Sequence, residues 1–591
     1  MASEPSAKRI AGFAAVATLL FTVLLGRLWQ LQVVQGAYYL QLSEENRLRD
    51  LRLPAPRGIL YDRKGRPLVS NRAAFTVSLL AMELRDPERV LPRLAVLLGI
   101  PVETIRDRLA QARSRPFEPV RLLRDAPKNV VAMIEENRLD LPGVLIEVEP
   151  VRHYLYGALA AHALGYLGEI SAGELAARSG YRMGDLIGKS GTERIYDRKL
   201  RGHEGRLRVE VDARGRPLGV LSREPSHAGK SLVLTIDLDI QRAAEAALGE
   251  QTGAVVVLDP RNGEVLALVS HPAFDPNVFA AGITPERWRQ LSGDTGLRLL
   301  SRATDATYEP GSVFKVVTAA AALTRGTATR ETRVNCNGIF RLGRWVFHDL
   351  AAYGTVDFIT GVAKSCNVFF WTLGTRTGGD AMAEMARALG LGARTGIDLP
   401  SENAGLIPDS AWKRRTQGEP WYPGDNANMA IGQGWMNVTP LQIARMIAAV
   451  ANGGTLVRPH LVRQVIDPAT GTVERVTTGP TGTVGFRPDV LATLREALEA
   501  VVVRGTGRAV AIPGLAIAGK TGSAENPRGQ PHAWFAAYAP VDQPRIALAV
   551  LVEHGRRGGL VAAPIARAVL QAAFGIPAPP EAREGGEEGI R

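Results

Sequence analysis

An uncharged apolar stretch near the N-terminus constrains the fold of this chain more than any other feature. It runs from Ile10 to Gly26, with Lys8 and Arg9 before it and Arg27 after it. A helix of this length rises about 25 Å, slightly less than a typical hydrocarbon core. Basic side chains at both ends can extend that reach by snorkelling to the interface. The stretch therefore predicts a helix that crosses a membrane once.

A cleaved secretory signal is the alternative interpretation of this stretch. The apolar part of such a signal is usually shorter and ends at a small-x-small cleavage site. Here the bulky Leu28-Trp29-Gln30 follows instead. We therefore expect a retained anchor in the cytoplasmic (inner) membrane, with the N-terminus inside by the positive-inside rule and the rest of the chain on the outer, periplasmic side. No second long apolar run follows, so a single-pass protein is expected.

The chain has 591 residues, too many for one compact core, and its 46% apolar and 22% charged residues are ordinary for folded domains. The net charge of +12 is dispersed and suits an anionic membrane face or an acidic polymer. No block of Lys and Arg with interleaved aromatics occurs, which argues against nucleic-acid binding. The expected organisation is a cytoplasmic tail, an anchor, an N-terminal pedestal, a large C-terminal domain and a disordered tail, over residues 1–9, 10–30, 31–240, 241–576 and 577–591.

Several C-terminal segments have clear secondary-structure signals. Two apolar runs flank the turn Pro260-Arg-Asn-Gly263, which predicts a β-hairpin over 253–270. Residues 534–538 and 546–552 are typical of buried strands, and residues 563–573 of a closing helix. A further helix is expected from Asp239, with an acidic start and a glycine stop. In the N-terminal part, helical periodicity over 81–110 is expected to be broken by Pro87, Pro92 and Pro101.

Three short motifs follow one another in a fixed order: Ser312-Val-Phe-Lys315, Ser365-Cys-Asn367 and Lys520-Thr-Gly522. Together they contain a nucleophile, a base, a proton relay and a clamp for a carboxylate. That set suffices for acyl transfer through a covalent serine ester. Each motif alone has a high false-positive rate, because an N-cap serine or a solvated lysine produces the same letters. The ordered set carries the hypothesis.

The first motif predicts an activated serine. Glu309-Pro-Gly311 breaks structure before Ser312, and residues 313–323 have the pattern of an apolar helix, so Ser312 is expected at a helix N-terminus that favours an alkoxide. Lys315 lies one turn on, along the same face. Apolar neighbours would desolvate its ammonium and lower its pKa, and a neutral amine could then take the serine proton.

The other two motifs predict the rest of the cleft. Ser365 is expected to relay a proton to the leaving amine, while Asn367 holds Lys315 and a substrate amide. Lys520 and the Thr521 hydroxyl are expected to bind a terminal carboxylate, and Gly522 to let a substrate backbone approach. We expect an apolar strand over 515–519 to lead into this motif, with alternation placing Lys520 and Thr521 on opposite sides. The backbone N–H groups of Ser312 and Ser523 are candidates for the oxyanion hole.

The chain resembles the penicillin-binding transpeptidases of the high-molecular-mass, bitopic class B, and within them the elongation-type group of penicillin-binding protein 2. Besides the three motifs, the resemblance rests on Arg57-Gly-Ile-Leu-Tyr-Asp-Arg63, Arg152 to Tyr166, Gly188-Lys-Ser-Gly-Thr-Glu193, Ala427-Asn-Met-Ala-Ile-Gly-Gln-Gly434, Thr439-Pro-Leu-Gln442, His532-Ala-Trp-Phe535, Ala539-Pro-Val-Asp-Gln-Pro544 and Glu553-His-Gly555. Two departures are Leu155, where the family often has proline, and Ser523, where it often has threonine. Neither threatens the expected chemistry.

The resemblance implies an α+β fold, with a single N-terminal transmembrane helix, an elongated α/β pedestal of the dimerisation type and a transpeptidase domain built on an antiparallel sheet flanked by helices. It implies that Ser312 attacks the penultimate carbonyl of a peptidoglycan stem peptide ending in D-Ala-D-Ala, and that an amine of a neighbouring strand resolves the ester. β-Lactams would acylate Ser312. The implied partner is a membrane-embedded RodA-type glycosyltransferase, and no cofactor is implied.

The two cysteines, Cys336 and Cys366, are too few for a disulfide scaffold. One bridge is possible, but we expect two unlinked buried thiols. Some members of the family carry a metal near the first cysteine, and Cys336, His348 and Asp349 are the candidate zinc ligands in this chain. Their spacing and number are poor for zinc, and no metal is expected.

Other functions remain open at this point. A serine β-lactamase shares the three motifs, but no Leu-Asn dipeptide of the class A deacylation motif occurs, and the anchor and long spacer argue against it. A β-lactam sensor would need several membrane spans. Two alternatives to the elongation enzyme remain open. One is a division-specific class B transpeptidase, and the other is a protein that mainly activates its glycosyltransferase without catalysis.

Overall fold

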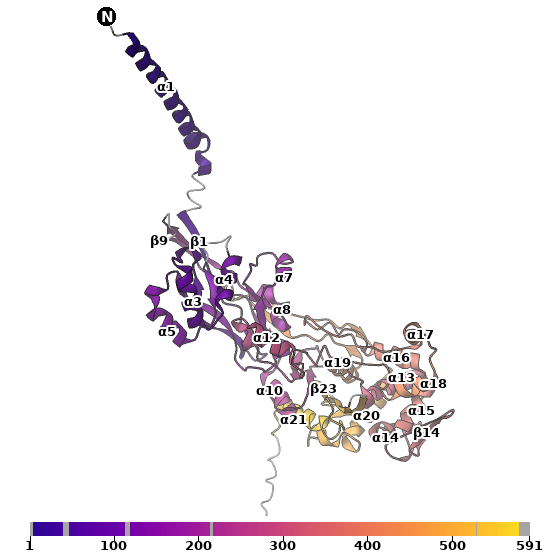
Figure 1. Cartoon of the computed structure of the whole chain (residues 1–591). Coiled ribbons are helices and arrows are strands. Elements are labelled where there is room, and N and C mark those ends of the chain that lie inside the picture. Colours follow the sequence, from indigo (N-terminus) through magenta and orange to yellow (C-terminus); the bar gives the residue numbers. More distant parts are fainter. Residues whose placement is uncertain (1–3, 40–46, 113–118, 213–216, 527–528, 578–591) are drawn as a thin grey trace, which may run out of the picture. The chain divides into compact units, whose positions relative to one another are not determined.

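The computed structural model describes residues 4–39, 47–112, 119–212, 217–526 and 529–577 (Figure 1). Most of the expected disordered tail, residues 578–591, and the first three residues of the expected cytoplasmic tail lie outside the described residues. The chain forms two compact units whose segments interleave along the sequence. The first unit comprises Met1–Pro56, Arg72–Val151 and Gly202–Ala228, and the second comprises Arg57–Asn71, Arg152–Arg201 and Gly229–Arg591. The linear domain limits expected from the sequence stay a prediction.

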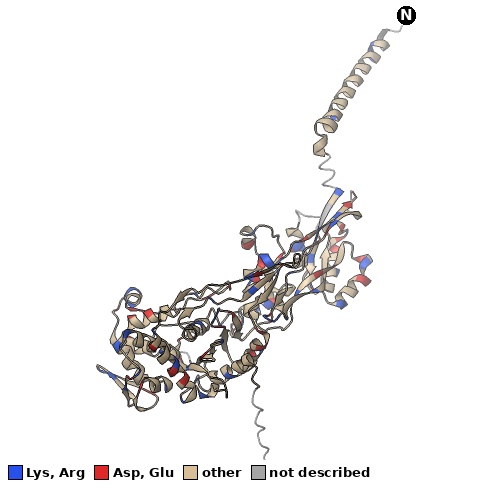
Figure 2. Cartoon of the chain, turned by 180° about the vertical axis from the view of Figure 1, so that it is seen from behind, with Lys and Arg blue, Asp and Glu red and all other residues tan. Residues whose placement is uncertain are grey.

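Helix α1 (Glu4–Trp29) contains most of the expected anchor and continues into a short π-helical segment, Gln30–Val34. The span Ala7–Val34 is long and apolar enough to cross a membrane, and none of its most apolar window is buried in the protein. In Figure 2 the middle of α1 is tan, because its charged residues lie only toward the ends. Exposed Leu, Val and Phe side chains along this helix would be costly in water and are suited to lipid.

The first unit combines a small sheet with a helical cluster. Strands β1 (Leu48–Leu53), β8 (Gly205–Val211) and β9 (Pro217–Glu224) form an antiparallel three-stranded sheet. Helices α3 (Pro87–Leu98), α4 (Val102–Gln111) and α5 (Lys128–Glu136) enclose a separate apolar core.

The expectation that three prolines break the helical periodicity was correct at two of them. Pro87 begins α3 and Pro101 caps α4, positions where the missing N–H is not needed. Pro92 lies inside α3, and the expectation of a break there was wrong. Burial of Leu91 and Leu94 on either side of it keeps the helix continuous.

The second unit is built on an antiparallel five-stranded sheet, in the order β12-β11-β23-β22-β21. The expected hairpin is present as β11 (Gly253–Leu258) and β12 (Val265–His271), and the expected buried strands are β22 (Gly529–Ala539) and β23 (Ile546–Val552). Strand β21 (Ala518–Asn526) forms one edge.

Helices cover both faces of this sheet. Val255 and Val257 of β11 pack with α10 (Leu238–Leu248) and α21 (Ala562–Phe574) in one core cluster. Ala254 and Val256 pack in the other cluster with α13 (Lys315–Arg325) and α19 (Pro440–Ala451). All residues of β11 are buried for this reason. Its side chains alternate between two apolar cores, one on each face of the sheet, and neither face of the strand is exposed to water. The α+β expectation and the antiparallel sheet are confirmed.

Smaller elements complete the fold. Further α-helices in the described part of the chain are α6 (Ala161–Leu164), α7 (Ala172–Ala176), α8 (Gly191–Ile195), α9 (Asp197–Leu200), α11 (Asn277–Ala280), α12 (Pro285–Ser292), α14 (Phe358–Ala363), α15 (Asn367–Thr377), α16 (Gly379–Ala388), α17 (Ser410–Gln417), α18 (Pro423–Ala430) and α20 (Pro488–Val503). The remaining strands are β2 (Leu60–Tyr61), β3 (Pro67–Leu79), β4 (Val120–Leu123), β5 (Val144–Tyr154), β6 (Leu167–Glu169), β7 (Leu186–Gly188), β10 (Ser231–Leu234), β13 (Val334–Cys336), β14 (Ile339–Leu342), β15 (Trp345–His348), β16 (Gly354–Val356), β17 (Thr455–Leu456), β18 (Val462–Ile466), β19 (Val473–Arg475) and β20 (Gly482–Thr483).

Candidate active site

The three sequence motifs meet in the second unit. The Lys315 amine donates to the Ser365 carbonyl oxygen at 2.8 Å, to Ser365 Oγ at 3.2 Å and to Asn367 Oδ1 at 2.6 Å. The Lys520 amine donates to the same Ser365 Oγ at 2.8 Å. Residues from α13, the start of α15 and β21 therefore form one connected polar cluster inside an otherwise apolar core.

Ser312 lies in a 3₁₀ turn, Gly311–Phe314, that directly precedes the helix; the expected α-helix does not begin at residue 313. Helix α13 begins at Lys315. The turn is tight because Gly311 has φ +52° and its N–H donates to the Gly432 carbonyl at 3.0 Å. A Cβ on Gly432 would lie 2.0 Å from the Gly311 carbonyl oxygen, so glycine is required there. The stretch around Gly432 thus supports the turn from behind.

The side chain of Ser312 is half-buried, and within the described residues its hydroxyl has no hydrogen-bond partner. The Lys315 amine donates to Ser365 and Asn367 rather than to Ser312. Catalytic hydrogen bonds are often long until substrate binds, so this arrangement leaves the hydroxyl available for attack.

Burial lowers the pKa of both lysines. Lys315 is 1% exposed, and desolvation lowers the pKa of its amine to about 7, while the nearby Asp349 carboxylate acts in the opposite direction. Lys520 is fully buried, and desolvation together with the neighbouring Lys315 charge holds its pKa well below the ordinary value. Two ammonium groups that share one acceptor in a dry site disfavour double protonation. The sequence prediction of an uncharged base at Lys315 agrees with this direction.

Strand β21 aligns the third motif. The sequence placed an apolar strand over 515–519, ahead of Lys520, but β21 begins at Ala518 and the motif lies within it. The Thr521 hydroxyl meets the Thr506 hydroxyl at 2.6 Å, while Lys520 contacts Ser365, so the two side chains have different neighbours as alternation predicts.

Gly522 and Ser523 place β21 against the nucleophile turn. A Cβ on Gly522 would lie 2.8 Å from Val313 Cγ2, and a Cβ on Gly311 would lie 2.8 Å from the Ser523 carbonyl oxygen. The absence of side chains at these glycines lets strand and turn approach closely. Ser523, the next residue of β21, is exposed.

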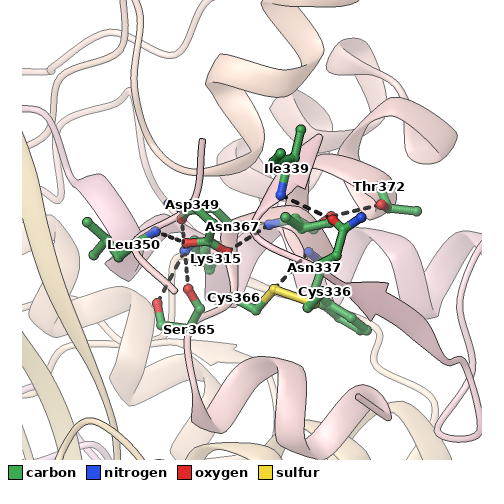
Figure 3. Close-up of a disulfide and its surroundings, with 12 residues drawn as sticks. Lys315, Cys336, Asn337, Ile339, Asp349, Leu350, Ser365, Cys366, Asn367 and Thr372 are labelled. Atoms are coloured by element: carbon green, nitrogen blue, oxygen red, sulfur yellow. Dashed lines mark hydrogen bonds between the residues drawn. A yellow bond between two sulfur atoms is a disulfide. The ribbon is translucent and has the colours of Figure 1, made fainter. Parts of the chain in front are cut away.

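The two cysteines form a disulfide, Cys336–Cys366, and the expectation of unlinked thiols was wrong (Figure 3). The sequence contains no signal for this disulfide, because the two cysteines meet only where β13 packs against the start of α15. The bridge also removes Cys336 as a thiolate, so the zinc set with His348 and Asp349 does not fit the structure.

Asp349 is a residue to which the sequence assigned no role, since the zinc set that included it was rejected. Its carboxylate accepts the Val368 N–H at 3.2 Å, at the N-terminus of α15, and raises the pKa of Lys315. Figure 3 shows it on the same side of the turn as Lys315 and Ser365. Thr506, the partner of Thr521, was missed entirely, because nothing in the sequence links it to the motifs.

Comparison with known families agrees with the geometry. The model of the family described as "Penicillin binding protein transpeptidase domain" matches residues 253–571, which include all three motifs. The model described as "Penicillin-binding Protein dimerisation domain" matches residues 52–234.

Individual relatives are similar over nearly the whole chain. "Peptidoglycan D,D-transpeptidase MrdA" of Acinetobacter baumannii is 35% identical over 564 residues, covering 91% of this chain and 84% of the relative. A structure of penicillin-binding protein PBP2 with MreC from Helicobacter pylori has a TM-score of 0.77 at 26% identity, covering 89% of this chain and 100% of that one. A structure described as a peptidoglycan synthase complex that coordinates polymerization and crosslinking has a TM-score of 0.72 at 34% identity, covering 97% and 99%.

Proposed function

The chain belongs to the class B penicillin-binding proteins, in the group of penicillin-binding protein 2, and we propose that its acyl-enzyme forms on Ser312. It is a serine-type peptidoglycan D,D-transpeptidase of cell elongation. The observation that carries the residue assignment is the pair of hydrogen bonds that Lys315 and Lys520 donate to one Ser365 hydroxyl. Such convergence of a base, a relay and a second buried amine next to an unpaired serine has the pattern of an activated nucleophile.

The first step is the removal of a proton from Ser312. The neutral Lys315 amine, which has two N–H groups and so donates only two of its three hydrogen bonds, takes the proton on its lone pair. The Ser312 oxygen then attacks the penultimate carbonyl carbon of a stem peptide ending in D-Ala-D-Ala. The N–H groups of Ser312 and Ser523 stabilise the oxyanion of the tetrahedral intermediate. Asn367 accepts a hydrogen bond from Lys315 at 2.6 Å, which keeps the amine near the turn, and its amide nitrogen is available to a substrate amide.

The second step is the departure of the terminal D-Ala. Ser365 Oγ accepts hydrogen bonds from two lysine amines, so its single proton is free to be donated. Ser365 gives that proton to the leaving nitrogen and recovers one from the protonated Lys315. The C–N bond breaks, and the acyl group remains on Ser312 as an ester. An amine of a neighbouring strand then attacks the ester carbonyl, and the same groups operate in reverse.

The third motif orients the substrate. Lys520 recognises the terminal carboxylate through its charge, whereas the Thr521 hydroxyl, expected from the sequence to share this contact, lies on the other side of β21 and meets Thr506 instead. The extended stem peptide lies along the edge of β21, while Gly522, expected from the sequence to face the substrate, instead lets this strand pack on Val313 of the nucleophile turn. β-Lactams enter the same site and acylate Ser312, because their carboxylate and carbonyl reproduce the end of the stem peptide.

The assignment is tested by mass spectrometry of the intact protein after incubation with a β-lactam, followed by peptide mapping. We expect one adduct, on the peptide that contains Ser312, and no adduct with Ser312→Ala. Ser523→Ala is the matched control, since it keeps the N–H that the proposal uses and should still acylate. An adduct on another residue, or an adduct that survives in Ser312→Ala, would remove the nucleophile assignment; rapid turnover of nitrocefin would favour the β-lactamase alternative.

The N-terminal part supports a proposal about position in the membrane and about a partner. The apolar helix Ala7–Val34 is compatible with a membrane anchor. We infer that its N-terminus lies inside and that residues 31–240 form a pedestal for a catalytic domain over 241–576 on the outer side. A glycosyltransferase of the RodA type is the proposed partner, met through the anchor and the pedestal. Co-purification of the two proteins from membranes, with and without replacement of residues 10–30 by an unrelated span, tests this contact.

A further inference from the structure

The segment from Cys336 to Asp349 is attached at both of its ends to the turn that carries Ser365 and Asn367. The segment consists of the last residue of β13, the β14–β15 hairpin and the residue that follows β15. No sequence motif includes it. We call it the brace, and Figure 3 shows both of its attachments beside Lys315.

The first attachment is the disulfide between Cys336 and Cys366. Both half-cystines are fully buried, and Cys366 stands between the two residues that receive the Lys315 amine. Cys366 also caps α15, because its Sγ accepts the Phe369 N–H at 3.3 Å. The cross-link therefore ties the start of this helix covalently to β13, which is itself paired with β16.

The second attachment is Asp349. Its Oδ2 accepts the Val368 N–H at 3.2 Å, and its Oδ1 accepts the Leu350 N–H at 2.7 Å. A carboxylate at a helix N-terminus is favourable and fixes the direction of the first turn. Between the two attachments, Phe340 and Phe347 of the hairpin pack on Trp371 of α15, with ring centroids 5.8 Å and 5.4 Å apart.

The turn needs such support because Ser365 has φ +57°, a conformation that residues with a Cβ rarely adopt. A residue of this kind persists only where its surroundings hold it. Part of this support is local, because the N–H groups of Ser365 and Cys366 donate to the Val362 and Gly361 carbonyls at the end of α14, both at 3.1 Å. The brace adds contacts at Cys366, which directly follows Ser365, and at Val368, so that its two attachments flank Asn367.

We propose that Asp349 and the Cys336–Cys366 disulfide are positioning residues for the transpeptidase reaction, which hold Ser365 and Asn367 on Lys315 and place a carboxylate charge opposite its amine. This inference rests on the proposed function of Ser312 and Lys315. The two attachments have separable effects: the disulfide acts through geometry alone, whereas Asp349 acts through geometry and charge.

The charged groups that face Lys315 are Asp349, after β15, and Lys520, on β21. Burial lowers the pKa of Lys315, and Asp349 counteracts part of that effect by stabilising the ammonium. Loss of the carboxylate charge should therefore lower the pKa of Lys315 further. Loss of the disulfide removes no charge and should leave the pKa of Lys315 unchanged.

The test measures the acylation rate of the full-length protein by a fluorescent penicillin as a function of pH. For Asp349→Asn we expect the rising limb of the profile to move to lower pH and the plateau rate to fall, with Asp349→Glu returning the limb toward that of the wild type. Asp409→Asn is the matched control: Asp409 caps α17 in the same way, accepting the Trp412 N–H at 2.7 Å, but lies outside the cluster. It should leave the profile unchanged.

The disulfide is removed in the double variant Cys336→Ala/Cys366→Ser, which keeps an oxygen acceptor at the cap of α15. We expect an unchanged limb and a plateau reduced on the order of 10- to 100-fold, since small misplacements of catalytic groups have effects of that size. Thermal unfolding of each variant identifies any that fail to fold.

The proposal is overturned if the limb of Asp349→Asn coincides with that of the wild type, or if the double variant acylates at the wild-type rate. In either case the adduct would still map to Ser312, and the proposed function would stand. Absence of a Ser312 adduct in the wild type would instead refute the function itself.

Discussion

Lys520 donates a 2.8 Å hydrogen bond to the Ser365 hydroxyl across 155 residues of sequence. The same oxygen receives the Lys315 amine at 3.2 Å. Ser365 is therefore a hydrogen-bond partner of both lysines, and the three motifs form a polar cluster through it. The assignment of proton relay to this residue leads to the first prediction.

Ser365→Ala should slow acylation by a β-lactam about 100-fold or more, the usual contribution of a positioned general acid. The variant also leaves two buried amines without a shared acceptor, so some loss of stability is expected. Stopped-flow measurement of the acylation rate, with thermal unfolding alongside, separates the two effects. Wild-type acylation in a folded variant would show that the proton reaches the leaving nitrogen by another route.

Acylation should depend on pH through Lys315. Only the neutral amine can accept the Ser312 proton, and burial lowers the pKa of Lys315 to about 7, so the rate should rise as pH increases through about 7. Lys315→Arg serves as the control, because a guanidinium does not deprotonate and should lose the activity at every pH. A rate that is flat between pH 5 and 9 would contradict the role of Lys315 as base.

The same shift makes a prediction about stability. The pKa of Lys315 is lower in the folded protein than its ordinary value of 10.5, so between pH 7 and 10.5 the unfolded chain binds more protons at this residue. Its contribution to stability therefore rises with pH across that window. The free energy of unfolding in urea is measured at pH 7 and pH 9 for the wild type and Lys315→Met. From pH 7 to pH 9 it should increase less, or decrease more, in the variant than in the wild type.

Gly432→Ala should displace the nucleophile turn. Gly432 has φ +79°, and an added Cβ would lie 2.0 Å from the Gly311 carbonyl oxygen. We expect a loss of roughly 2–4 kcal/mol in the free energy of unfolding together with slow acylation. Gly418→Ala has a similar φ of +71° but meets nothing within 4 Å, so it should cost about 1 kcal/mol and acylate normally. Equal behaviour of the two variants would remove the support role given to Gly432.

Glu193→Ala should strongly destabilise the second unit. Glu193 is fully buried and accepts hydrogen bonds from Arg57 at 2.6 Å and Arg152 at 2.7 Å. Removal of one partner from a buried ion-pair network typically costs about 3–5 kcal/mol, because charges remain without compensation. Glu496→Ala, which breaks an exposed pair with Arg330, should change little. The midpoint of the first thermal transition distinguishes the two; similar midpoints would show that water reaches the buried arginines.

Local structure in the second unit could be predicted well from the sequence. The β11–β12 hairpin, the buried strands β22 and β23, and helices α10 and α21 were all expected from turn residues and apolar periodicity. Each of these signals lies within a few residues of sequence, so the elements can be predicted without knowledge of the tertiary contacts. Where packing decides the outcome, prediction failed: Pro92 was expected to break a helix, and the start of α13 was placed too early.

The chemistry of this protein was determined by its sequence alone, because the identities and order of Ser312, Lys315 and the other motif residues name the groups that react. The tertiary structure decided how reactive these groups are and which partners they contact. Desolvation of Lys315, the shared contact at Ser365 and the Cys336–Cys366 pairing all arise from segments that are distant along the chain and adjacent in the fold. A side chain's pKa and partners depend on what surrounds it in space, and a linear pattern contains no direct record of those neighbours.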